Sequence, residues 1–233
     1  MRRITARATL AVTAMLAFAY ATPAQAEPFY VKGTGLGVSG LQIMAPHYFT
    51  GFAGQIALDR GLSGTSDDFF AYCVDAGKTK TLSQDMTIRN LSGLPDNTNP
   101  ANVQPEAGAR VAWLLNTYGK SWLATDGNNR AAALQLAIWE VLYDPFGSYD
   151  VKSGTFKLLY WDQYAPLVSY TSTYLASLGD NRSEAIWLDV TDTRLSAGQD
   201  FAMPVPAPEP GSIVLFGSGL VGLARIARRR RNS

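Results

Sequence analysis

The chain has 233 residues, of which 47% are hydrophobic and 17% are charged, and its formal net charge is +1. This near-neutral total conceals an uneven distribution, because eight of the 20 basic residues lie in the first seven and the last nine residues. Residues 27–224 hold the other 12 basic residues and all 19 acidic ones, a net charge of −7. An acidic body argues against nucleic-acid binding, and the lack of a visible internal repeat excludes solenoids and propellers.

The N-terminus has the three parts of a secretory signal peptide, which we place at residues 1–26. An uncharged apolar segment, residues 8–21, follows a short basic segment. Ala24 and Ala26 supply the small residues of a cleavage site, so we expect signal peptidase to leave an exported chain that begins at Glu27. The basic residues of the first segment are Arg2, Arg3 and Arg7.

The next part of the chain predicts a domain, residues 27–201, that is long enough for one packed core. Residues 29–62 are rich in glycine and β-forming residues, which favours short strands joined by tight turns. A further strand is predicted over residues 69–77, and residues 85–104 are expected to form a loop because of their Asn and Pro content.

Two helices are predicted in the middle of the domain, over residues 105–119 and 128–145, from apolar residues at helical spacing. Pro105 suits the first turn of the first helix, and Asn128 or Asn129 suits the N-cap of the second.

A third, less regular helical region is predicted over residues 156–178, interrupted near Pro166, and strands return at residues 184–192 and 199–205. Strands at both ends of a helical middle predict a single α+β domain. A β-sandwich with surface helices is the alternative.

The C-terminus combines a proline-rich linker, residues 202–210, a hydrophobic segment, residues 211–227, and a basic tail, residues 228–233. From residue 211 to residue 224 the uncharged run is shorter than the roughly 20 residues that span a bilayer, which predicts a weak and transient membrane anchor. The arginines would stay at the cytoplasmic face. A permanent short anchor and an amphipathic surface helix are the alternatives. The tail arginines are Arg228, Arg229, Arg230 and Arg231.

The triplet Pro208-Glu209-Pro210, followed by the apolar run and the arginines, resembles the PEP-CTERM sorting signal of Gram-negative bacteria. The resemblance implies recognition and removal of the tail by an exosortase during delivery to the cell envelope, the cell surface or the extracellular matrix.

The chain has one cysteine, Cys73, so it cannot form an internal disulfide. An exported protein with a single cysteine has an intermolecular disulfide, a buried inert thiol or a reactive group at that position.

Two short segments bear on the choice among these three possibilities. Tyr72-Cys73-Val74-Asp75 and the later run Gln135-Leu-Ala-Ile-Trp139 resemble the hallmarks of the thioester domains of Gram-positive surface adhesins. Leu134 departs from that family, which usually has threonine there. The resemblance implies that the Cys73 sulfur and the Gln135 carboxamide condense to a thioester that captures amines on a partner, with Tyr72 and Trp139 shielding the bond. An inert Cys73 in the core of a structural or binding protein stays the alternative.

Enzymatic and metal-binding interpretations are weaker. His47, the only histidine, is a conceivable partner for Cys73, but no signature surrounds either residue. One His and one Cys are too few for a zinc site. Acidic pairs at residues 67–68 and at residues 189 and 192 do not follow a calcium-loop pattern. The glycines of residues 33–37 lack the setting of a phosphate loop. We therefore expect a non-enzymatic protein without a cofactor, whose surface or matrix partner the residues do not identify.

Overall fold

The computed structural model describes residues 26–45, 47–60, 69–78, 83–94, 103–119, 125–190 and 198–205. Residues 1–25 of the expected signal peptide and residues 206–233, with the sorting triplet, the hydrophobic segment and the basic tail, lie outside the described part of the chain. Among the described residues, no helix combines the length and the apolar character that crossing a membrane requires.

In the described part of the chain, seven antiparallel strands form one sheet, in the order β2-β3-β7-β6-β4-β1-β5. Strand β1 also pairs with β2, so six of the strands form a closed ring, and β5 adds to the far end of β1. Closure satisfies backbone groups that a free sheet edge would expose. The strands are β1 (Glu27–Met44), β2 (Tyr48–Arg60), β3 (Phe69–Cys73), β4 (Ser83–Asn90), β5 (Lys157–Leu158), β6 (Ile186–Val190) and β7 (Phe201–Met203).

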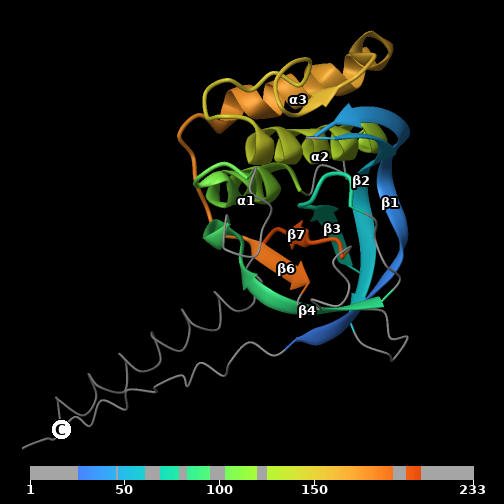
Figure 1. Cartoon of the computed structure of the whole chain (residues 1–233), viewed down its shortest axis with the longest axis vertical. Helices are drawn as coiled ribbons and strands as arrows, with labels where there is room; N and C mark the ends of the chain where they lie inside the picture. Colours follow the sequence, from blue (N-terminus) through green and yellow to red (C-terminus); the bar gives the residue numbers. More distant parts are fainter. Residues whose placement is uncertain are drawn as a thin grey trace, which may run out of the picture.

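Three α-helices stack at one end of the sheet, with α2 between α3 and the strands (Figure 1). Helix α2 contacts α1, α3, β1 and β2. Every residue from Ala131 to Tyr143 is buried, so α2 has no solvent-facing stripe over these residues and forms the centre of the domain. The helices are α1 (Ala107–Tyr118), α2 (Gly127–Tyr143) and α3 (Ala165–Leu178), with 3-10 turns η1 (Leu91–Gly93) and η3 (Trp161–Tyr164).

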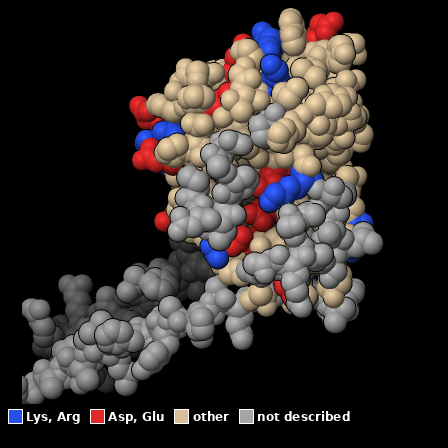
Figure 2. Space-filling model, viewed as in Figure 1, with Lys and Arg blue, Asp and Glu red and all other residues tan. Residues whose placement is uncertain are grey.

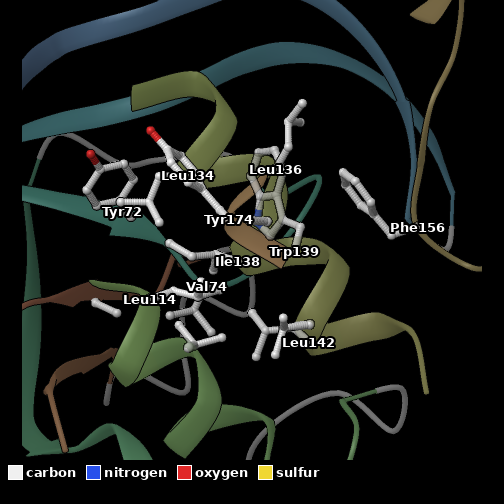
Figure 3. Close-up of a cluster of buried hydrophobic side chains, with 14 of the residues drawn as sticks. Tyr72, Val74, Leu114, Leu134, Leu136, Ile138, Trp139, Leu142, Phe156 and Tyr174 are labelled. Carbon is white, nitrogen blue, oxygen red and sulfur yellow. The ribbon is translucent and has the colours of Figure 1, made fainter. Parts of the chain in front are cut away.

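The buried side chains form two clusters, and half-buried Cys73 packs against both of them. The helical core lies between the helices and the sheet (Figure 3). The barrel core lies among the strands. The helical core is centred on Tyr72, Val74, Leu114, Leu134, Leu136, Ile138, Trp139, Leu142, Phe156 and Tyr174. The barrel core is Phe29, Val31, Ile56, Leu58, Ala71, Met86, Leu188 and Phe201.

On the face drawn in Figure 2, acidic and basic side chains lie beside one another in small groups. Glu106 accepts hydrogen bonds from Arg182 at 2.9 Å and from Arg110 at 3.3 Å. Water screens exposed pairs such as Glu106 with Arg182, so the two apolar cores dominate the stability of the fold.

The predicted α+β domain, with strands at both ends of a helical middle, is confirmed. The expectation of short strands in residues 29–62 is wrong, because β1 and β2 are long strands. Their glycines lie within the strands, where the pairing of β1 with β2 shifts register, and not in turns. The loop expected over residues 85–104 is wrong in its first part. Residues 85–90 belong to β4, whose backbone pairs with β1 on one side and β6 on the other.

Several predicted boundaries also shift. Helix α1 begins after Pro105, and α2 begins after Asp126, so Asn128 and Asn129 lie in its first turn instead of capping it. Pro166 lies in the first turn of α3, where its missing N–H costs nothing, and does not interrupt the helix. Strand β7 runs to Met203, past the expected start of the linker at residue 202.

Candidate functional site around Cys73 and Gln135

Cys73 is the last residue of β3, and Gln135 lies on the buried part of α2, 62 residues later. The backbone N–H of Cys73 donates to Oε1 of Gln135 at 2.8 Å. In return, Nε2 of Gln135 donates to the backbone carbonyl of Cys73, also at 2.8 Å. The carboxamide therefore lies directly against the backbone of the cysteine.

The ends of the strand pairings explain why this position is open to a side chain. Strand β2 pairs with β3 only as far as Gln55 and Tyr72, one residue before Cys73. On the other side, Cys73 pairs with Phe201 of β7. A buried amide needs hydrogen-bond partners, and Gln135, which is 1% exposed, finds both of them in the Cys73 backbone. The Gln135 amide therefore hydrogen-bonds to the backbone of β3 at the position where the pairing of β3 with β2 has ended.

Cys73 also lines a cavity of about 380 Å³. One part of the wall is aromatic, and Phe49 meets Trp139 there edge to face with ring centroids 6.0 Å apart. Another part is charged and polar, with Asp75, Lys78 and Gln199. The full lining is Phe49, Thr50, Gly51, Phe52, Ile56, Cys73, Asp75, Gly77, Lys78, Trp139 and Gln199.

Asp75 is buried, with only 2% of its surface exposed, and several groups hold it in place. Its Oδ2 accepts from the backbone N–H of Asp200 at 3.1 Å and lies 3.0 Å from Nζ of Lys78. The side chain of Gln199 donates to the backbone carbonyl of Asp75 at 2.8 Å. Oδ1 of Asp75 has no hydrogen-bond partner among the described residues.

Asp75 and Asp200 form a buried acidic pair beside the cavity. Burial raises the pKa of Asp75, and the charge of Lys78 opposes that rise. Burial and the charge of Asp75 raise the pKa of Asp200 to about 7. The Asp200 carboxylate is held by the backbone N–H of Val190 at 3.0 Å and by the indole N–H of Trp187 at 3.3 Å. The two carboxyls share a low-dielectric site, so near neutral pH the pair resists carrying two negative charges.

The structure places four of the five residues expected around a thioester at one site: Cys73, Gln135, Asp75 and Trp139. Tyr72 is different, because it is buried in the helical core and does not line the cavity. It supports the strand next to Cys73 from the core side.

The alternative partners for Cys73 and the metal interpretations receive no support from the described geometry. His47 is exposed in the turn between β1 and β2 and is not among the residues that line the cavity. Within the described ranges, no group of three His, Cys, Asp or Glu residues is arranged to hold a metal ion. Asp189 instead pairs with Arg89 at 2.9 Å. Asp67, Asp68 and Asp192 lie outside the described residues.

Sequence reasoning missed the residues that complete the site from other elements. Phe49 and Phe52 come from β2, and Gln199 and Asp200 directly precede β7. Asp200 lies 125 residues from Asp75 along the chain, so no local pattern connects the two. For the charged part of the site, the sequence offered one signal, which was Lys78 three residues after Asp75. The same spacing of an acidic and a basic residue also occurs in many surface turns.

A search of the curated proteins finds none that matches the sequence. Among solved structures, the fold is similar to the N-terminal thioester domain of a protein F2-like fibronectin-binding protein from Streptococcus pneumoniae, with a TM-score of 0.46 and 11% identity over 76% of this chain and 92% of that chain. Because this similarity is low, the chemistry of the site is inferred from the contacts and distances of its own residues.

The C-terminal resemblance is confirmed, because residues 206–231 match the PEP-CTERM protein-sorting motif. Proteins with this motif are exported, processed by an exosortase and sorted to the cell surface. The chain is therefore an exported protein that carries a PEP-CTERM sorting motif at its C-terminus.

Proposed function

We propose that the exported domain is a covalent capture module, in which Cys73 and Gln135 form an internal thioester that acylates a nucleophile on a surface or matrix partner. The observation that carries the proposal is the pair of reciprocal 2.8 Å hydrogen bonds between the Gln135 carboxamide and the Cys73 backbone. These bonds hold the carbon that must be attacked next to the residue that bears the thiol. Such preorganisation replaces a search by two distant segments with a local reaction.

The chemistry balances without a cofactor. The thiolate of Cys73 attacks Cδ of Gln135, the carbon–nitrogen bond of the carboxamide breaks, and the nitrogen leaves as ammonia after it takes up a proton. An amine of the partner then attacks the same carbon, Cys73 leaves as a thiolate and is protonated, and an amide joins the partner to Gln135. A hydroxyl would give an ester in the same way.

The surroundings of Cys73 support this use of the residue. Cys73 reaches a cavity, so a nucleophile has a route to the bond. The rings of Phe49, Phe52 and Trp139 supply an apolar wall, which slows hydrolysis because it limits the water near the acyl carbon. As the chain's one cysteine, Cys73 has no second thiol in the same molecule to attack the thioester by exchange.

A non-reactive structural or binding component of the matrix is the second candidate. The same hydrogen bonds favour this candidate, because they link α2 to β3 and give both polar ends of the Gln135 amide a partner without any reaction. In that case Cys73 serves as a small apolar residue between the two cores.

Intact mass of the purified exported chain separates the two candidates. The thioester predicts a mass lower by one ammonia, and this deficit disappears in Cys73→Ala and in Gln135→Ala. The matched control is Gln163→Ala, which removes an exposed glutamine of η3 and keeps the deficit. Full mass in the unmodified chain, together with a thiol that is alkylated in the native state, contradicts the thioester and favours the structural candidate.

The sorting motif gives this module a position outside the cell. We infer that residues 211–227 anchor the chain in the membrane only until the exosortase removes the tail. In a host with an exosortase, antibodies to the segment around Arg228–Arg231 then lose the protein once it reaches the envelope, while antibodies to the domain keep it. Persistence of the full-length chain at the surface contradicts transient anchoring.

A further inference from the structure

We infer that Asp75 is the proton acceptor for the nucleophile that enters the cavity beside Cys73. This inference rests on the proposed thioester and assigns a residue that makes capture efficient. Asp75 lines the same cavity as Cys73, two residues further along the chain. Its carboxylate is the only one among the cavity residues that the structure describes.

The two oxygens of this carboxylate differ in a way that suits the role. Oδ2 is fixed by Lys78 and by the backbone N–H of Asp200, so the orientation of the group is set. Oδ1 has no hydrogen-bond partner in the described part of the chain although the residue is 2% exposed. A buried oxygen without a donor is costly, and an incoming N–H or O–H group would satisfy it.

The step needs such an acceptor. When an amine attacks Cδ of Gln135, its nitrogen gains positive charge and must lose a proton before Cys73 departs. Asp75 takes that proton, the carbon–sulfur bond breaks, and the Asp75 carboxyl returns the proton to the Cys73 thiolate. The products are one amide and one thiol, with no further reactant.

The charges around Asp75 set the pH range in which it works. Lys78 faces it from its own loop and Asp200 from the residues before β7, where Asp200 in turn faces Asp189 and its partner Arg89 on β6 and β4. Another titratable neighbour among the described residues is Tyr143 of α2, whose hydroxyl accepts from the backbone N–H of Ala76 at 3.1 Å and whose pKa is raised to about 12, mainly by burial.

Burial raises the pKa of Asp75 and the charge of Lys78 opposes that rise, so the basic form of Asp75 grows as the pH rises through this raised pKa. The rate of capture, divided by the concentration of free-base nucleophile, should therefore rise with pH and then level off. Removing the charge of Lys78 should move this rise to higher pH, because Asp75 then ionises less easily.

The experiment follows the reaction of the exported protein with hydroxylamine by intact mass over a range of pH. Asp75→Asn keeps an oxygen for the N–H of Asp200, so we expect it to retain the ammonia deficit but to react roughly 100-fold more slowly near neutral pH and to lose the pH-dependent rise. Lys78→Gln should keep the rise and shift it to higher pH. Asp59→Asn, which removes a buried carboxylate of β2 away from the cavity, should match the unmodified chain.

An unchanged rate and pH profile in Asp75→Asn overturns the inference. If that variant does not fold, Lys78→Gln decides, because a rise that stays at the same pH also overturns the inference. A missing ammonia deficit in the unmodified protein is a separate result, since it removes the thioester itself and not only the role of Asp75.

Discussion

Helix α2 carries two buried polar side chains, Gln135 and Glu140, and they are accommodated in opposite ways. Gln135 is 1% exposed and both ends of its amide bond the Cys73 backbone. Glu140 is fully buried, and only its Oε1 accepts a hydrogen bond, from the backbone N–H of Asp150 at 2.7 Å. Its Oε2 has no partner among the described residues.

The difference shows what a buried helix can tolerate. A neutral amide is buried at little cost once donor and acceptor are matched, whereas a carboxyl in the same environment favours its protonated form. Burial and, after it, the charge of Asp144 raise the pKa of Glu140 to about 8. The hydrogen bonds between Gln135 and Cys73 are therefore independent of pH. The hydrogen bond between Glu140 and the loop after α2 depends on pH.

The largest expected effect tests the Gln135 side of this comparison. In a Cys73→Ala chain, where no thioester can form, Gln135→Ala removes the two hydrogen bonds that its amide makes with the backbone of residue 73 and opens a cavity beside α2. We expect the free energy of unfolding to fall by about 3 kcal/mol, measured by chemical denaturation. Gln163→Ala in the same background should change it by less than about 0.5 kcal/mol. A loss below about 1 kcal/mol for Gln135→Ala would mean that the amide is not needed as a tie.

The loop after α2 gives a second, smaller effect. Asp144, at the C-cap of the helix, accepts from the backbone N–H groups of Thr155 at 2.7 Å and Phe156 at 2.8 Å. Asp144→Ala should lower the free energy of unfolding by about 2 kcal/mol, because the two hydrogen bonds to the loop are lost. Amide hydrogen exchange at residues 155 and 156 should accelerate, whereas the exposed control Asp162→Ala leaves it unchanged. Unchanged exchange would show that other contacts hold the loop.

The smallest effect concerns pH. Folded Glu140 keeps its proton up to about pH 8 and the unfolded chain loses it near 4.5, so the free energy of unfolding falls as the pH rises between these values. Glu140→Gln removes this contribution and can still accept from the N–H of Asp150. At about pH 5.5, one unit above the pKa of the unfolded chain, we expect the variant to be more stable than the unmodified chain by about 1 kcal/mol, with the difference vanishing below pH 4.5. Parallel stability curves for the two proteins would contradict the raised pKa of Glu140.

Local patterns predicted the parts of the molecule in which neighbours along the chain decide the outcome. Helix α2 was predictable because its residues are strong helix formers at apolar spacing, and Cys73 and Gln135 were singled out by their immediate surroundings. Strand β4 was missed because its sequence, with polar residues at most positions, gives no strong alternation. Its strand conformation depends on pairing with β1 and β6, which lie far away in the chain.

By itself, the sequence determined the C-terminal sorting motif, the α+β order of elements and the two residues at the centre of the site. These depend on composition and short-range spacing, which the chain carries before it folds. Only the tertiary structure decided that the Gln135 amide meets the Cys73 backbone, that the strands close into a ring, and that Asp75 is joined by Asp200 beside a cavity. The physical reason is that Gln135 lies 62 residues from Cys73, and Asp200 lies 125 residues from Asp75. Only the packing of α2 on the sheet and the pairing of β3 with β7 bring these segments together.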